Sequence, residues 1–267
     1  MKSYIPASRA KDFIAELASA GRYCFTSDDA RQWLGGSAAS AKMALNRLAR
    51  RGQIASPARG FYVVVPPEYT SLGCLPADQF IPELMARAEQ SYYVGLLSAA
   101  QYHGAAHQRS QALQVMLERA RRPIHCGKVR VVFVVRKRLA EVPVRSFNTP
   151  RGVIRVATPE ATAIDLVGYP HHAGGLDHVA TLLVELVGQL DPRRLVAAAK
   201  TAPVTWAQRL GYLLEVLECG EQAAALRAYV SQSARDTVAL VPGAARDNAR
   251  VDRNWKLIIN TEVEPEF

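Results

Sequence analysis

Cysteine is scarce in this sequence. Four thiols, Cys24, Cys74, Cys126 and Cys219, are spread through 267 residues, and none lies in a C-x-x-C pair. This spacing disfavours a zinc ribbon or a dithiol redox motif, because both use closely paired cysteines. We therefore expect free thiols in a reducing cytosol. A chain of this length can bury a hydrophobic core large enough for stability without disulfide bonds or bound metal ions.

Long apolar runs are also missing. No stretch approaches the roughly 18 residues that a membrane-spanning helix needs. The N-terminus is polar and charged, without the apolar core of a signal peptide. Hydrophobic residues nevertheless make up 49% of the chain and charged residues 21%, which is a globular composition. We expect a cytoplasmic protein that has no membrane partner.

Catalytic motifs are a third absence. The sequence contains no G-x-S-x-G, Walker A or H-E-x-x-H motif. Gly35-Gly36-Ser37 resembles the glycine-serine pair that opens a nucleotidyltransferase site, but no D-x-D or D-x-E pair follows to hold two metal ions. His103 and His107 have i, i+4 spacing, yet Gly104 lies between them and no nearby glutamate completes a metal site. We expect a protein that is not an enzyme, with no cofactor and no metal.

Positive charge, in contrast, is plentiful in the first half. The formal net charge is +9. Residues 1–65 hold ten basic and four acidic side chains, residues 66–150 eleven and six, and residues 151–267 twelve and fourteen. This excess suits a polyanionic partner, although ordinary surface charge explains it equally well. The middle of the chain contains two basic clusters, Arg119 to Arg122 and Arg136 to Arg138. They could enlarge the surface that contacts DNA or bind an acidic protein. Alternatively, they could simply be solvent-exposed charges at the ends of strands.

The first 65 residues predict three helices and a hairpin. Helices are expected over 9–20, over a short segment capped by Thr26 or Ser27, and from Ser37 to about Arg51, with glycines after each. Apolar strands at 54–55 and 61–65 flank a loop that contains proline and glycine, which is a hairpin pattern. Seven apolar residues are expected to form a small core: Phe13, Leu17, Trp33, Leu45, Leu48, Ile54 and Tyr62.

The third of these helices has two different faces. Ala41, Leu45 and Leu48 recur at i, i+4 and i+7 and predict a buried stripe. The opposite face is expected to carry Ala39, Ser40, Met43, Arg47 and Arg50, with Lys42 and Asn46 on its flanks. Any solvated helix face is polar, so this alone is weak support. Two short helices before it and a hairpin after it make the pattern typical of a winged helix-turn-helix.

A recognition helix needs this arrangement of side chains. Small residues allow close approach to the DNA groove, Asn and Arg hydrogen-bond base edges, and Lys and Arg neutralise phosphates. Arg59 at the wing tip would reach phosphate or the minor groove. The residues expected to contact DNA are Ser37, Ser40, Lys42, Met43, Asn46, Arg47, Arg50 and Arg59.

The remainder of the chain predicts an α+β protein. Pro66-Pro67 ends the hairpin and suggests a boundary between domains at 1–66 and 67–267. Strands are expected at 113–117, 130–135, 142–147, 153–157 and 255–260. Helices are expected at 81–90, 95–102, 158–167, 176–190, 193–200, 205–217 and 221–229. The second domain is therefore mixed α/β and becomes helical toward its C-terminus.

Several short motifs, in this order, resemble the AbiEi family. The stretch Arg59-Gly60-Phe61-Tyr62 is similar to the family's R-G-x-Y wing. Further similarities follow along nearly the whole chain: Tyr92-Tyr93-Val94, Leu97 to Ala100, His103-Gly104-Ala105, Thr158-Pro159-Glu160, Asp165-Leu166, Gly174-Gly175-Leu176, Arg209 to Glu215 and Asn254 to Leu257.

The resemblance implies an antitoxin and autoregulator of a type IV, abortive-infection toxin–antitoxin operon. It implies two partners: its own operator in double-stranded DNA, with inverted repeats, and a nucleotidyltransferase-type toxin. It also implies a C-terminal domain distantly similar to nucleotidyltransferases but without their catalytic carboxylates. Three alternatives stay open: a regulator with a ligand-sensing C-terminal domain, a DNA-reading nucleotidyltransferase or nuclease, and an interaction module that does not bind DNA.

Overall fold

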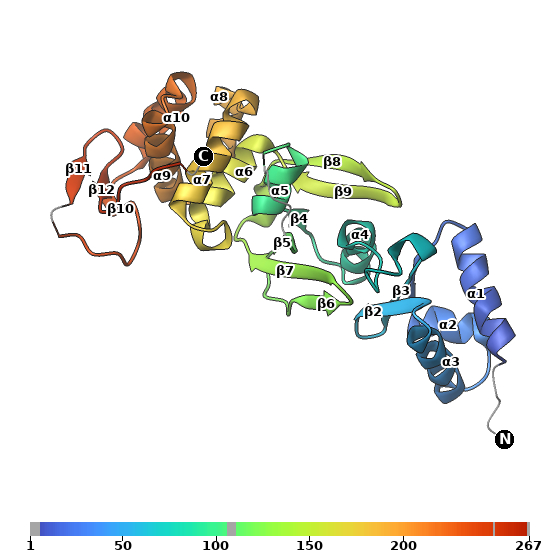
Figure 1. Ribbon diagram of the computed structural model, residues 1–267. Coiled ribbons are helices and arrows are strands. Elements are labelled where there is room, and N and C mark those ends of the chain that lie inside the picture. The colour runs from blue at the N-terminus through green and yellow to red at the C-terminus, as the bar shows by residue number, and fades with distance from the viewer. Residues whose placement is uncertain (1–5, 106–110, 248, 266–267) are drawn as a thin grey trace.

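The computed structural model describes residues 6–105, 111–247 and 249–265. The molecule is elongated, with three helices near the N-terminus at one end, a six-stranded sheet in the middle and a group of helices at the other end (Figure 1). It is a mixed α+β structure, as the sequence predicts.

Residues up to Val65 form a helical layer on a small sheet, which we call the N-terminal unit. Its helices are α1 (Ala7–Ser19), α2 (Ser27–Leu34) and α3 (Ala38–Arg50). Its strands are β1 (Cys24–Thr26), β2 (Ile54–Ala58) and β3 (Phe61–Val64), which are antiparallel in the order β1-β3-β2. Strand β1 is not in the prediction, because three residues have too little pattern and pairing with β3 alone defines them.

The apolar faces of these helices and one face of the sheet form a small core. Its buried residues are Ala10, Phe13, Leu17, Phe25, Ala30, Leu34, Ala41, Ala44, Leu45, Leu48, Ile54 and Val64. Trp33 and Tyr62, which the sequence also placed in this core, are partly buried and pack at its edge. Five of the seven residues predicted for this core are therefore buried in it: Phe13, Leu17, Leu45, Leu48 and Ile54.

The central sheet contains six strands in the order β6-β7-β5-β4-β9-β8. The strands are β4 (Tyr93–Val94), β5 (Leu113–Leu117), β6 (Ile124–Cys126), β7 (Val129–Val135), β8 (Val144–Thr149) and β9 (Gly152–Ala157). The pairs β5–β7 and β4–β9 are parallel, and the other neighbours are antiparallel. The prediction missed β4 and β6, which are only two and three residues long.

Helices cover this sheet and continue it toward the C-terminus. They are α4 (Ala77–Arg87), α5 (Leu96–Tyr102), α6 (Pro159–Gly168), α7 (Leu176–Leu186), α8 (Pro192–Ala199), α9 (Val204–Val216) and α10 (Gly220–Ser233). Short 3-10 turns lie at Pro67–Tyr69, Leu139–Glu141, Pro170–His172 and Val187–Gln189. A last small sheet joins β10 (Val238–Ala239), β12 (Leu257–Ile259) and β11 (Arg250–Asp252).

Several predicted elements have different bounds in the structure. The strand expected at 142–147 is Val144–Thr149, and the helix expected at 176–190 ends at Leu186 and is followed by a 3-10 turn. Helix α4 begins four residues before the predicted position and contains Pro82, because Phe80, Ile81 and Leu84 pack into the core. The closing strand is limited to Leu257–Ile259, and the indole of Trp255 is buried against α9. A Cβ at Gly211 of α9 would lie 1.9 Å from that indole, so only glycine permits this approach.

The hairpin of β2 and β3 is buried on both faces. Ile54 and Val64 belong to the small core of the N-terminal unit. Phe61, Val63 and Val65 belong instead to the large core of the rest of the chain. Because successive side chains of a strand point to opposite faces, one short hairpin serves both cores. The N-terminal unit is therefore packed onto the central sheet rather than tethered by a linker.

The centre of the large core contains a buried ion pair. The Arg136 Nε lies 2.9 Å from Asp165 Oδ1, and the two side chains are 2% and 1% exposed. The Tyr93 hydroxyl donates to Asp165 Oδ2 at 2.6 Å, and the guanidinium also donates to the Thr201 carbonyl and lies over the Trp206 ring. The interpretation of Arg136 as part of a surface basic cluster is therefore wrong, because its charge is satisfied inside the protein.

We expect Asp165→Leu to lower the free energy of unfolding by about 3–5 kcal/mol, because it leaves a guanidinium buried without its carboxylate. Urea denaturation followed by circular dichroism measures the change. The matched control is Glu141→Ala, which removes the partner of Arg138 from an exposed ion pair and should leave the midpoint nearly unchanged. The double change Arg136→Met with Asp165→Leu should recover much of the loss. Equal losses at the buried and exposed pairs would contradict this account.

Candidate nucleic-acid interface

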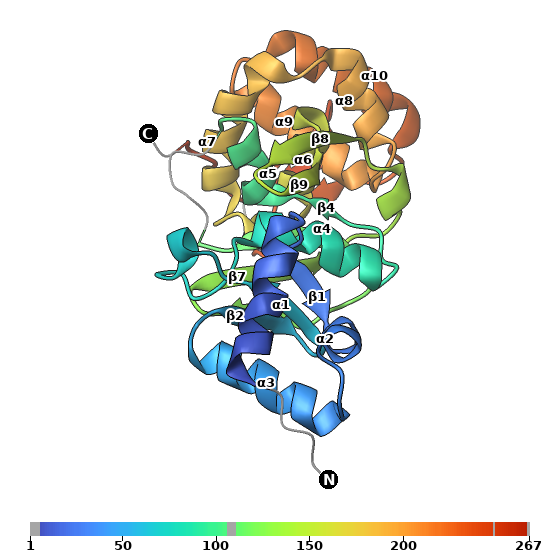
Figure 2. The same ribbon diagram turned by 90° about the vertical axis from the view of Figure 1, so that its right-hand side faces the viewer.

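Helix α3 lies at the end of the molecule remote from α8 and α10 in both views (Figures 1 and 2). Gly35 and Gly36 have positive φ, at 69° and 78°, and form the tight connection from α2. Ser37 is the N-cap of α3, and its Oγ accepts a hydrogen bond from the Ser40 backbone N–H at 3.1 Å. The sequence predicted this start correctly, because a glycine turn and a capping serine are local signals.

The outer face of α3 is polar, cationic and open to solvent. Ala41, Ala44, Leu45 and Leu48 are buried on the inner side. The exposed residues on the other side are Ala39, Lys42, Met43, Asn46, Ala49 and Arg50. Met43 is 58% exposed, so its thioether is accessible to a partner. Arg47 is half-buried at the margin of this face.

Ser40 does not lie on the outer face, contrary to the prediction. It is only 8% exposed, and its Oγ donates to the Ser37 carbonyl at 2.8 Å. A serine in the first turn of a helix readily bonds nearby backbone, and here that bond turns the hydroxyl inward. Ser40 therefore fixes the beginning of α3 and does not present its side chain to solvent.

Arg59 occupies the turn between β2 and β3 and is exposed. Next to it, Gly60 adopts a φ of 72°, and its carbonyl accepts a hydrogen bond from the Ser27 N–H at 3.1 Å. On the other side of the turn, the guanidinium of Arg87 in α4 lies 6.0 Å from the Phe61 ring centroid. The tip of the hairpin thus lies between the start of α2 and the central sheet with its covering helices, which we call the central unit.

The N-terminus of α2 forms a reciprocal capping box. The Thr26 hydroxyl accepts from the Asp29 backbone N–H at 3.1 Å, and the Asp29 carboxylate accepts from the Thr26 N–H at 2.7 Å. The structure therefore selects Thr26 over Ser27 as the cap. Asp29 also pairs with Arg87 at 3.2 Å, across to α4. Burial alone would raise the pKa of Asp29, but the Thr26 hydrogen bonds and the Arg87 charge outweigh it and lower that pKa.

A second contact between the N-terminal unit and the central unit centres on Arg151. Its guanidinium lies 3.3 Å from the centroid of the Tyr23 ring. Its Nε donates to Gln79 Oε1 at 2.9 Å, and its Nη2 lies 3.3 Å from Glu68 Oε1. Neither this contact nor that of Arg87 was predicted from the sequence, because both join residues that are far apart in the chain. Arg151 does stand in an Asn-Thr-Pro-Arg-Gly turn, which is the local signal that could have drawn attention to it.

The histidine and cysteine candidates are placed as follows. The His103 ring is buried, with its Nε2 2.7 Å from the Ala157 carbonyl, while His107 lies outside the described residues. The four cysteines are free thiols. In the described ranges, no group of three or more His, Cys, Asp or Glu side chains is arranged to hold a metal ion. No helix in that part of the chain has the length and apolarity to cross a bilayer.

Comparison with known families gives two matches. The model described as "AbiEi antitoxin C-terminal domain" matches residues 93–216. The model described as "Transcriptional regulator, AbiEi antitoxin" matches residues 12–65, which lie within the N-terminal unit. A search of curated proteins found no match.

Comparison with solved structures gives a similar fold. The RV2827C protein from Mycobacterium tuberculosis is 20% identical in sequence and superposes with a TM-score of 0.66. The match covers 95% of this chain and 92% of that one, so it includes both the N-terminal unit and the remainder. At this identity the likeness is one of fold alone.

We expect Asp29→Ala to lower the free energy of unfolding by about 1–2 kcal/mol, because it removes half of the capping box. The pKa of Asp29 is lower in the folded protein, so its stabilisation is present above the ordinary carboxyl pKa of about 4 and is lost as the pH falls through the folded value. Thermal unfolding measured between pH 7 and pH 3 should show wild type and variant converging in acid. Asp28→Ala, at a highly exposed neighbour in the same turn, is the control. A constant difference across this pH range would argue against a role for the carboxylate charge.

Proposed function

The chain belongs to the AbiEi family of antitoxins and transcriptional regulators, and from this premise we propose that it represses its own operon by binding operator DNA and counteracts the toxin of that operon. The observation that carries the DNA-binding part is the exposed cationic and polar outer face of α3. This face lies at the end of the molecule, where a duplex can approach it without meeting α6 to α10 (Figure 2).

The order of elements in the N-terminal unit supports the proposal that it is a winged helix-turn-helix. Helices α2 and α3 are joined by the Gly35-Gly36 turn, and the β2–β3 hairpin follows α3 as the wing. In such modules the second helix of the pair enters the major groove. The wing here packs against α4 and β6, so we propose that α3 makes the base contacts and that only Arg59, at the exposed turn, adds a backbone contact from the wing.

The polar and cationic side chains on or beside the outer face of α3 each have a proposed role. Asn46 and the half-buried Arg47 hydrogen-bond base edges, and Lys42 and Arg50 neutralise phosphates. Met43 makes apolar contact in the groove, and Ser37 lies where the helix N-terminus approaches the backbone. Ser40 is buried, so we assign it a supporting role at the cap rather than a contact with DNA.

We expect Asn46→Ala and Arg47→Ala each to weaken operator binding by about 1–3 kcal/mol and to relax sequence preference. Lys42→Ala should weaken binding to all sequences and reduce the salt slope by about one unit. Fluorescence anisotropy with a labelled promoter duplex and a scrambled duplex measures both effects. Lys11→Ala, an exposed cation on α1, is the matched control. Equal affinity of the wild type for both duplexes would contradict sequence-specific binding.

We propose that the two functions divide at residues 66 and 67. The segment 1–66 would read DNA, and the segment 67–267, which contains the match to the antitoxin C-terminal domain, would counteract a nucleotidyltransferase-type toxin. We assign no catalytic role to either segment. The central β4–α5–β5 segment, with Gly95 between β4 and α5, is compatible with a distant nucleotidyltransferase-like shape for the second segment. The toxin partner itself rests on the family relationship.

This division predicts that variants of the full chain separate the two functions. The double variant Lys42→Ala with Arg47→Ala should lose repression of a promoter reporter yet still protect cells that express the toxin from an unrelated promoter. The physical reason is that the two side chains lie on or beside the outer, solvent-facing side of α3, and α3 is remote from α8 and α10 (Figure 2). Growth and reporter output are measured in the same strains, with Lys11→Ala as control. Loss of protection together with repression would mean that protection comes from repression.

A further inference from the structure

Two cysteines that are far apart in the sequence, Cys74 and Cys126, meet at the edge of the central sheet. Cys74 lies in the loop before α4 and is 0% exposed, and Cys126 is the last residue of β6. The Cys74 thiol donates a hydrogen bond to the Cys126 sulfur. No C-x-x-C spacing indicates this pair, so it is a product of the fold.

Close approach of two backbone segments brings these thiols together. The Lys128 backbone N–H donates to the Leu72 carbonyl at 2.7 Å, and Gly73 lies against Gly127. These contacts follow opposite orders along the two segments, so the two cysteines are the next residues to face each other. Gly127 has a φ of 57°, and a Cβ there would lie 2.1 Å from the Leu72 carbonyl oxygen, so only glycine permits this approach.

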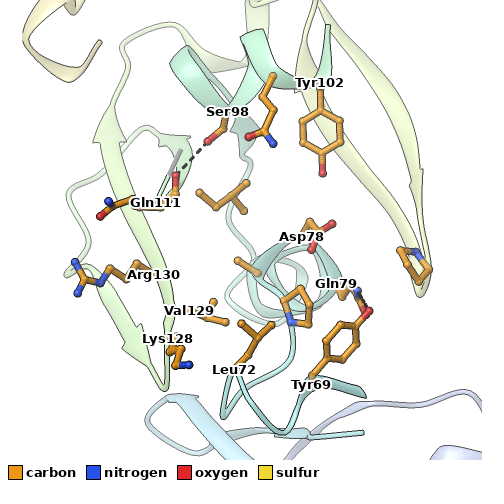
Figure 3. A pocket seen from close by; sticks show the side chains of 16 residues that line it. Tyr69, Leu72, Asp78, Gln79, Ser98, Tyr102, Gln111, Lys128, Val129 and Arg130 are labelled. Carbon is orange, nitrogen blue, oxygen red and sulfur yellow. Dashed lines mark hydrogen bonds between the residues drawn. The ribbon is translucent and has the colours of Figure 1, made fainter. Parts of the chain in front are cut away.

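Solvent reaches one side of this contact. Cys126 is 9% exposed at the end of an edge strand, and Lys128 in the turn after it is exposed. Figure 3 shows Leu72 next to Lys128 and Val129, and all three line the pocket drawn there. Of the two sulfurs, Cys126 is therefore the one that a small solute can reach, because Cys74 is completely covered.

The surroundings favour a negative charge on Cys126. The hydrogen bond from Cys74, together with a weaker one from the Ser56 backbone N–H, outweighs burial and lowers the pKa of the Cys126 thiol. Cys74 is the donor in this contact, so its pKa is raised. Cys24 on β1 lies near the pair, but burial and secondly the charge of Glu83 raise its pKa to about 12, so it stays protonated. The thiolate is the nucleophilic form of cysteine, which makes Cys126 the attacking sulfur.

We propose that Cys74 and Cys126 form a reversible disulfide when a hydroperoxide reaches Cys126, and that this bond changes how the β2–β3 hairpin packs on the central unit. The Cys126 sulfur attacks one peroxide oxygen, an S–O bond forms as the O–O bond breaks, and the departing oxygen takes a proton from water. The Cys74 sulfur then attacks the sulfenic acid on Cys126. The S–S bond forms, the S–O bond breaks, and the oxygen leaves as water with the Cys74 proton. Two thiols have then given two electrons to one peroxide, and a dithiol reverses the step by exchange.

The hydrogen bond from Ser56 connects this site to the hairpin. Ser56 lies in an irregularity of β2 between Ala55 and Ala58, where the pairing with β3 shifts. Its hydroxyl donates to the Ala58 carbonyl at 3.0 Å, and its N–H donates to the Cys126 sulfur. A covalent S–S bond is much shorter than a hydrogen-bonded contact between thiols, so forming it draws the Cys126 sulfur toward Cys74 and away from Ser56. Oxidation therefore removes a contact between β2 and β6, which lie against each other.

The bond is tested by treating the reduced full chain with hydrogen peroxide, alkylating the remaining thiols and mapping peptides by mass spectrometry. We expect a cross-link between Cys74 and Cys126, with Cys24 and Cys219 alkylated, and dithiothreitol should restore all four thiols. Cys74→Ala keeps the attacking sulfur without its partner, so Cys126 should stay a sulfenic acid that dimedone traps. Cys219→Ser, at the thiol just before α10, should form the cross-link as the wild type does. A cross-link that uses Cys24 or Cys219, four thiols still free after treatment, or no dimedone on Cys126 in Cys74→Ala would overturn the site.

The effect on the hairpin is tested by hydrogen–deuterium exchange of the reduced and the oxidised wild type. We expect the Ser56 amide, read from overlapping peptides over 54–58, to exchange about fivefold faster after oxidation because it loses its acceptor. Exchange in α10 should not change. Cys126→Ala lacks both the acceptor and the bond, so exchange at Ser56 should be fast and insensitive to peroxide. Equal exchange at Ser56 in the two states of the wild type would overturn the structural part. Neither test involves DNA or toxin, so their failure is distinguishable from failure of the proposed repressor function.

Discussion

The two-sided burial of the β2–β3 hairpin is the constraint on which the arrangement of the molecule depends. Val64 faces the small core under α1 to α3, and its neighbours Val63 and Val65 face the large core of the central unit. A strand alternates its side chains, so the orientation of one core fixes that of the other. The packing of the hairpin between the two cores therefore determines how α3 is oriented relative to the central sheet. The proposed boundary at residues 66 and 67 separates functions, whereas the hairpin joins the two cores.

Electrostatics reinforces this arrangement at the edges of the hairpin. Arg87 joins α4 to the cap of α2 through Asp29, and Arg151 joins the β8–β9 turn to Tyr23. Both contacts are at least partly buried, since the side chains of Arg87 and Arg151 are 28% and 15% exposed. Each contact joins a specific pair of surfaces and so favours one orientation of the N-terminal unit. Deeper inside, Arg136, directly after β7, pairs with Asp165 of α6, and Tyr93, Thr201 and Trp206 supply further contacts to the two charges. Cations in this protein therefore have two uses: some join elements of the fold, and others lie on the outer face of α3, which we assign to DNA.

The helices of the N-terminal unit were predictable because their signals are local. The Gly35-Gly36 turn, the Ser37 cap and the apolar stripe of α3 all involve residues within one or two turns of each other. The sequence prediction placed Ser40 on the outer face of α3 because helical periodicity gives only the direction of a side chain from the helix axis. It does not predict that the Ser40 hydroxyl donates to the backbone carbonyl of Ser37. The short strands β1, β4 and β6 were missed because a strand of two or three residues is defined by its neighbour in the sheet rather than by its own pattern.

The sequence by itself determined the local conformations, the mixed α+β class, the cationic helix and the family to which the chain belongs. Only the tertiary structure decided which charges are buried, which face of the hairpin meets which core, and that Arg151 contacts both Gln79 and Tyr23. The physical reason is separation along the chain. Asp29 and Arg87 are 58 residues apart, and Arg136 and Asp165 are 29 apart. No periodicity or capping rule links such pairs, so their meeting is settled when the cores pack together.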